Sequence, residues 1–237
     1  MGEFFQTLIF GIYPYVALAV LAIGSIIRYD REPYTWRSGS SQLLRRRQLV
    51  IGSVLFHVGV LVVFFGHLIG LLTPIEVFDW LGIGHGLKQV AAIAVGGVAG
   101  VLALVGATML AHRRLFDSRI RRTSGFADSA IILILWVQLV LGLLTIPFSL
   151  GHLDGAEMVK FMSWARGIYT FDLDAAGYIA DVSPVFKLHL FLGLTIFLLF
   201  PFTRLVHMLS VPLRYIWRPG YQVVRARRQV RRLPAAE

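Results

Sequence analysis

Four histidines stand inside or at the edges of long uncharged stretches of this sequence. Two lie in one stretch, His57 and His67, and two in another, His189 and His207. An imidazole can ligate a metal ion, and an ionisable group within a long apolar helix is costly enough to suggest a function. A lone histidine could instead be a hydrogen-bonded packing residue. Two histidines on each of two helices favour a cofactor site.

The direction of the two helices, more than the spacing of the histidines, predicts how they pair. Ten residues separate His57 from His67 and eighteen separate His189 from His207, which correspond to about 15 Å and about 27 Å of helix rise. If the two helices are antiparallel, His57 pairs with His207 and His67 with His189. The two rises differ by about 12 Å, which helix tilt and a bend at Pro201 would have to absorb.

Haem fits such pairs better than a bare metal ion does. The sequence has no cysteine, which excludes thiolate metal sites, iron–sulfur clusters and disulfides. Zinc or copper needs three or four converging donors, whereas two imidazoles fill both axial positions of a haem iron. Because no position is then left for oxygen, the pairs predict two haems that transfer electrons.

The elements that must hold these histidines are membrane spans. Of the 237 residues 57% are hydrophobic and 15% charged, and the mean hydropathy of +0.71 is too high for a water-soluble domain. Five stretches are long enough to cross a bilayer as helices, the element that satisfies its own backbone there. They are Phe4–Ile27, Gln48–Ile75, Gln89–Ala111, Ser129–Leu153 and Pro184–Ser210. We therefore expect an all-α membrane protein, with a five-helix haem-binding bundle in residues 1–210 and a basic tail in 211–237.

The segments that connect or follow these spans are alternately rich and poor in arginine. Segments 28–48, 113–127 and 204–237 hold six, five and eight arginines, whereas 73–88 and 151–187 together hold four basic residues and seven acidic ones. By the positive-inside rule the N-terminus lies outside, in the periplasm, and the C-terminus in the cytoplasm. The net charge of +10 thus reflects topology, lipid head groups and partner docking, and nucleic-acid binding is not expected. No Asp or Glu lies within the spans, which argues against a proton or cation transporter.

This topology makes His57 and His207 an inner pair and His67 and His189 an outer pair. Lys88 is expected at the outer mouth of the third span, where it either reaches toward water or binds the head group of a quinol. Gly66 and Gly70 leave space beside the outer pair for that head group or for haem.

Glycines also predict where two spans pack. Gly52, Gly59 and Gly66 recur every seven residues, and such stripes usually mark close contact between membrane helices. The helical angles place this stripe nearly opposite His57, so we interpret it as a packing seam.

Short motifs along nearly the whole chain carry a family resemblance. They are Ile12-Tyr13-Pro14-Tyr15, Arg28-Tyr29-Asp30, Tyr34-Thr35-Trp36-Arg37, Leu55-Phe56-His57, Gly66-His67, Leu72-Thr73-Pro74, Lys88-Gln89, Arg113-Arg114-Leu115-Phe116, Leu143 through Ser149, Leu188-His189-Leu190, Leu199-Phe200-Pro201-Phe202 and Val224-Arg225-Ala226-Arg227. In these motifs the chain resembles the gamma subunit of respiratory nitrate reductase, a dihaem cytochrome b of the bacterial cytoplasmic membrane. Two departures are Lys187, where the family has arginine, and an apparent one-residue insertion between His67 and Lys88.

The resemblance implies a role in anaerobic nitrate respiration. Quinol would be oxidised near the outer face, beside a b-type haem on His67 and His189. Electrons would cross to a b-type haem on His57 and His207 and leave for an iron–sulfur beta subunit, while a molybdenum-containing alpha subunit reduces nitrate. Two alternatives stay open: the cytochrome b subunit of another quinol-linked reductase, such as one of sulfur metabolism, and a non-redox membrane anchor or transporter.

Overall fold

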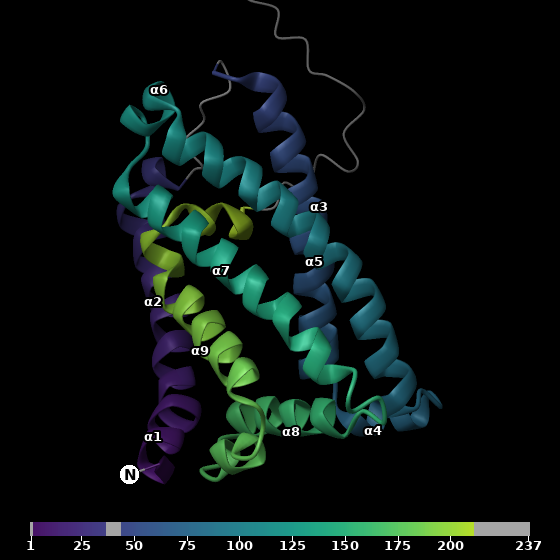
Figure 1. Ribbon diagram of the computed structural model, residues 1–237. Coiled ribbons are helices and arrows are strands. Elements are labelled where there is room, and N and C mark those ends of the chain that lie inside the picture. The colour runs from purple at the N-terminus through teal and green to yellow at the C-terminus, as the bar shows by residue number, and fades with distance from the viewer. Residues whose placement is uncertain (1, 37–43, 211–237) are drawn as a thin grey trace, which may run out of the picture.

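The computed structural model describes residues 2–36 and 44–210, and the elements in this part of the chain are helical (Figure 1). Five of its helical segments are long and apolar enough to cross a membrane. They are Gly2–Arg31, Arg46–Leu72, His85–Phe116, Phe126–Ser149 and Pro184–Phe202. The predicted all-α class and the five spans are thereby confirmed. The predicted basic tail, residues 211–237, lies outside the described residues.

The first span is interrupted by one π-helical turn. It consists of α1 (Gly2–Thr7), the π-helical η1 (Leu8–Ile12) and α2 (Tyr13–Arg31). Pro14 lies in the first turn of α2 and cannot donate a backbone hydrogen bond to the preceding turn. A π-helical turn changes the hydrogen-bond register at that point, so the span continues past the proline.

The second, third and fourth spans are continuous helices. They are α3 (Arg46–Leu72), α5 (His85–Phe116) and α7 (Phe126–Ser149). α5 extends beyond the predicted Gln89–Ala111 at both ends, and its last turn carries Arg113 and Arg114. Basic side chains are favourable there because they face the negative end of the helix dipole.

The fifth span differs from the prediction, which continued it as a bent helix to Ser210. Helix α9 (Pro184–Leu199) is followed by a 3-10 turn, η4 (Phe200–Phe202), and then by Thr203 in an extended conformation, with φ −122° and ψ 179°. Pro201 lacks an N–H and its ring crowds the preceding turn, which weakens the helix here, and in the structure the helix ends instead of bending. The chain then forms a second 3-10 segment, η5 (Arg204–Leu209), which turns across the bundle in Figure 1.

This break resolves the mismatch in rise between the two pairs of histidines. His189 lies on α9, whereas His207 lies on η5 and not on a continuation of α9. A straight helix would carry His207 about 27 Å beyond His189. Because the chain turns at Thr203, His207 can instead lie level with His57.

Helices α3 and α5 pack through small residues. A Cβ atom added to Gly59 would lie 2.4 Å from the carbonyl oxygen of Ala99, and one added to Gly106 would lie 2.3 Å from the amide nitrogen of Phe56. Added to Gly52, it would lie 3.1 Å from a side-chain atom of α5. Only residues without a larger side chain permit this approach, so the predicted seam is confirmed at Gly52 and Gly59. At Gly66 no atom lies within 4 Å of an added Cβ, and the seam has ended.

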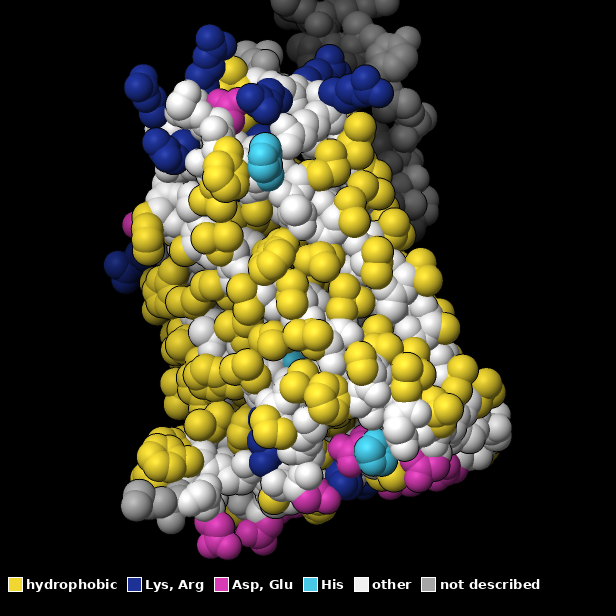
Figure 2. Space-filling model, viewed as in Figure 1, with side chains coloured by type: hydrophobic (Ala, Val, Ile, Leu, Met, Phe, Trp, Pro, Cys, Tyr) yellow, Lys and Arg dark blue, Asp and Glu magenta, His cyan; other side chains and the backbone are white. Residues whose placement is uncertain are grey.

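Short elements cover the two ends of the bundle. One end carries α4 (Ile75–Trp80), α8 (Ala156–Thr170) and η3 (Ala175–Ile179), and α8 lies across the bundle in Figure 1. The other end carries η2 (Pro33–Thr35) and α6 (Ser118–Arg122). Figure 2 shows Asp and Glu gathered at the first end, Lys and Arg at the second, and a broad hydrophobic band between them. We call these the acidic end and the basic end.

Candidate functional site

The structure brings the four histidines together in two pairs. The ring centres of His57 and His207 are 6.2 Å apart, and those of His67 and His189 are 6.1 Å apart. Helix α3 supplies one member of each pair, while η5 and α9 supply the other members. These are the pairs that the antiparallel order of the two spans predicts.

Three of the four rings are oriented by the carbonyl of the turn before them. The Nδ1 atom of His57 lies 2.7 Å from the Ser53 oxygen, and that of His67 lies 2.8 Å from the Val63 oxygen. The Nδ1 atom of His207 is hydrogen-bonded to the carbonyl oxygen of Arg204. A carbonyl oxygen only accepts, so each Nδ1 carries the proton and the Nε2 lone pair is left for a metal.

His189 is held by packing instead. Its Nδ1 atom is buried and has no hydrogen-bond partner. On the neighbouring α7, Gln138 donates to the His189 carbonyl at 3.1 Å, and a Cβ added to Gly142 would lie 3.0 Å from the imidazole Cε1. The protein thus makes room for this ring without a hydrogen bond to its Nδ1 atom. An apolar, glycine-rich stretch gives no sign in the sequence that Gly142 has this role.

The separation of the rings fits axial ligation of a haem iron. Two metal–nitrogen bonds of about 2.0 Å, with about 1.1 Å from each nitrogen to its ring centre, place two ring centres about 6.2 Å apart. Both pairs match this separation. In the part of the chain that the structure describes, no three His, Cys, Asp or Glu residues converge as a zinc or copper site requires.

Lys88 lies among neutral groups near the acidic end. Its ammonium donates to the carbonyl oxygen of Gly70 at 3.1 Å and lies 2.7 Å from the Met162 sulfur. It also lies 3.7 Å from the centre of the Phe78 ring, a cation–π contact. Among the described residues, no carboxylate forms an ion pair with it. The side chain is therefore held between α3, α4 and α8, with a charge that no acid neutralises.

An apolar groove lies along α3 and α5. Its volume is about 410 Å³. It is lined by Val58, Gly59, Val62, Ala94, Val95, Val98, Ala99 and Leu102. Ala94 follows Lys88 by about 9 Å of rise along α5. An added Cβ at Gly66 or Gly70 would meet no atom of a neighbouring element within 4 Å, so the surface of α3 is open at these two positions.

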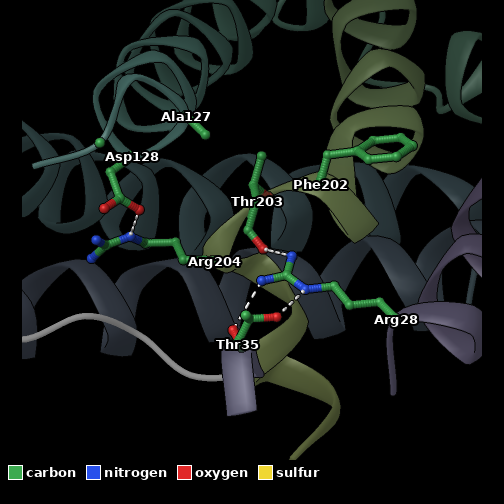
Figure 3. A pocket seen from close by; sticks show the side chains of 8 residues that line it. Arg28, Thr35, Ala127, Asp128, Phe202, Thr203 and Arg204 are labelled. Atoms are coloured by element: carbon green, nitrogen blue, oxygen red, sulfur yellow. Dashed lines mark hydrogen bonds and ion pairs between the residues drawn. The ribbon is translucent and has the colours of Figure 1, made fainter. Parts of the chain in front are cut away.

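A second cavity lies at the basic end, where η5 meets the neighbouring helices (Figure 3). Its volume is about 330 Å³. Arg28, Thr203 and Arg204 contribute to its wall. Arg204 is paired with Asp128 of α7, with 2.7 Å between Nε and Oδ1. No sequence pattern connects Arg28 with Thr203, because the two positions are far apart along the chain.

Comparison with known proteins gives one family. Residues 6–227 match the family model described as nitrate reductase gamma subunit. The respiratory nitrate reductase 1 gamma chain of Escherichia coli (strain K12) is 49% identical to this chain over 226 residues, which cover 95% of this chain and 99% of that protein. The respiratory nitrate reductase 2 gamma chain of the same organism is 48% identical over 96% of this chain and 100% of that protein. The nitrate reductase gamma chain of Bacillus subtilis (strain 168) is 38% identical over 93% and 98%.

Proposed function

The chain belongs to the family of nitrate reductase gamma subunits, the membrane cytochrome b subunits of respiratory nitrate reductase, and from this premise we propose that it holds two b-type haems and oxidises quinol. One haem would be held by His57 and His207, the other by His67 and His189. When bound, each haem would supply a one-electron carrier.

One observation carries the haem proposal: two pairs of imidazoles stand at the separation of axial ligands, 6.2 and 6.1 Å between ring centres. The carbonyls of Ser53, Val63 and Arg204 fix the rings of three ligands. Such outer hydrogen bonds set the tautomer and make the ligating nitrogen more basic.

Quinol is proposed to bind with its head group at Lys88. The ammonium would donate to a quinol oxygen and stabilise the negative charge that develops as a proton leaves. Its present partners are the Gly70 carbonyl, the Met162 sulfur and the Phe78 ring. All three are neutral, so no ion pair has to break when Lys88 turns toward a quinol.

The groove along α3 and α5 suits the apolar tail of a quinol. Val58, Val62, Val95 and Val98 line it, and each is at least 40% exposed, so it opens toward the lipid in which quinol diffuses. Quinone sites combine an apolar slot with a few polar groups at the head. The space at Gly66 and Gly70 would connect the slot to Lys88 and to His67.

We further propose that the acidic end faces the periplasm and the basic end the cytoplasm. The arginines at the basic end follow the positive-inside rule. Protons from quinol would then leave at the outer face. The basic end would dock the iron–sulfur beta subunit of the complex, with the molybdenum-containing alpha subunit behind it, because a basic surface attracts an acidic partner.

A reduced-minus-oxidised spectrum tests the proposal. We expect the purified chain to contain two haems with two low-spin b components. One haem, or a high-spin component in the intact chain, would contradict the pairing. A chain without haem would support the alternative of a non-redox anchor.

Nitrate should reoxidise the reduced haems in the assembled complex. If a sulfur compound does so and nitrate does not, the alternative of another quinol-linked reductase holds.

A further inference from the structure

The segment that carries His207 is not held by helical hydrogen bonding. Between Leu199 and Arg204 the chain passes through a 3-10 turn and one extended residue, Thr203. Carbonyl oxygens at such a break have lost their helical donors and need other partners. The position of His207 therefore depends on what holds this break.

Arg28 of α2 supplies those partners. Its Nη1 atom donates to the carbonyl oxygens of Pro201 and Thr203 at 2.6 and 2.8 Å. Its Nε and Nη2 atoms donate to the side chain and the carbonyl oxygen of Thr35, at 3.3 and 2.9 Å. Figure 3 shows the guanidinium between Thr203 and Thr35. One planar group thus ties the break to both α2 and η2.

The far end of η5 is held by the same stretch of chain. Trp36, directly after η2, donates from its indole nitrogen to the hydroxyl of Ser210, directly after η5. Between the two ends Val206 is fully buried and Leu205 is 7% exposed. Residues 28–36 therefore hold η5 at both ends, while His207 faces His57.

Arg28 is suited to this task by its geometry more than by its charge. Four of the hydrogen bonds that it donates go to neutral oxygens on two segments. The neighbouring Arg204 is instead paired with the carboxylate of Asp128. A lysine would carry the same charge as Arg28 but cannot direct donors from three nitrogens in one plane.

We propose that Arg28 is a positioning residue for the inner haem: it fixes the break after α9 and so places His207 opposite His57. This inference rests on the proposed function, because it takes His207 as an axial ligand. It predicts that a change at Arg28 affects one haem selectively, although the side chain itself ligates nothing.

The test compares Arg28→Lys and Arg28→Gln in the assembled membrane complex, with Arg31→Gln as the matched control. Arg31 lies on the same helix and is exposed, and within the described residues its guanidinium pairs with the exposed Asp30 at 3.5 Å. The readouts are the amplitude and midpoint potential of each b component. The inner component is the one that His207→Ala removes.

We expect both Arg28 variants to shift or lose the inner component, with the outer component unchanged and Arg31→Gln like the parent. An Arg28→Lys variant like the parent would overturn the inference, since charge alone would then suffice. Equal loss of both components, or a similar change in Arg31→Gln, would also overturn it. If His207→Ala keeps both components, the assignment of His207 as a ligand has failed, and the role proposed for Arg28 fails with it for that separate reason.

Discussion

Replacing Lys88 by alanine should slow quinol oxidation strongly while both haems are kept. The substitution removes the ammonium that lies 3.1 Å from the Gly70 oxygen and 3.7 Å from the Phe78 ring centre. A hydrogen bond from a charged donor contributes about 1.5 to 3 kcal/mol. If the hydrogen bond from Lys88 to the quinol stabilises the transition state alone, its loss lowers the rate of quinol oxidation by about 10- to 150-fold. The contacts of Lys88 are with Gly70, Met162 and Phe78 and not with a proposed ligand, so haem content should not change.

The assay is the rate of haem reduction by a quinol in membranes that contain the assembled enzyme. Lys88→Met separates the donor from the packing, because methionine keeps an unbranched stem beside Phe78 but cannot donate. Lys187→Ala is the control, since that ammonium also donates to a carbonyl, the Ala180 oxygen at 2.7 Å, but outside this site. A donor that acts downstream of the haems should drive the catalytic subunit at the parent rate.

A particular result would refute this reasoning. If Lys88→Ala and Lys88→Met both reduce their haems with quinol as fast as the parent, Lys88 only packs against its neighbours. The head-group site would then have to lie elsewhere around the outer pair. A slow alanine variant with a normal methionine variant would assign the effect to packing.

Three further predictions concern other parts of the chain. Gly142→Val should displace the His189 ring, which lies 3.0 Å from the added Cβ, at a cost of about 1–3 kcal/mol; the outer b component should fall, and an unchanged spectrum would refute the contact. Hydrogen bonds from its own backbone amide and from Arg166 lower the pKa of Glu76 from 4.5. The Glu76–Arg166 ion pair therefore stabilises α4 against α8 above pH 4.5, and this stabilisation is lost as the pH falls through the lowered pKa. Protection factors from hydrogen exchange should show this loss in α4 of the parent but not of Glu76→Gln, and identical profiles would contradict it. Truncation after Arg218 should release the soluble subunits and keep both haems, whereas full retention of the complex would assign the tail to lipid head groups.

The spans and the pairing of histidines could be predicted because they depend on local pattern and on chain direction. Uncharged stretches mark the helices, and two antiparallel helices order His57 and His67 against His207 and His189. The rises did not match, because the sequence shows Pro201 but not what the chain does there. A proline can bend a helix or end it. The outcome here depends on Arg28, a residue far away in the sequence.

The surroundings of Lys88 could not be predicted for a related reason. Phe78 and Met162 are common apolar residues whose spacing carries no signal. They meet the ammonium because α4 and α8 fold over the end of the bundle, and the Arg166–Glu76 ion pair at 2.5 Å links these two elements. Such contacts are set by tertiary packing, which a periodic pattern within one helix does not record.

The central claim, that each histidine pair holds its own haem, is tested most directly by replacing the four histidines one at a time. The measurement is the reduced-minus-oxidised spectrum of each alanine variant in the assembled complex. We expect His57→Ala and His207→Ala to remove one b component and His67→Ala and His189→Ala to remove the other, since the ring centres pair at 6.2 and 6.1 Å. If His57→Ala and His67→Ala abolish the same component and leave the other intact, the pairing is wrong.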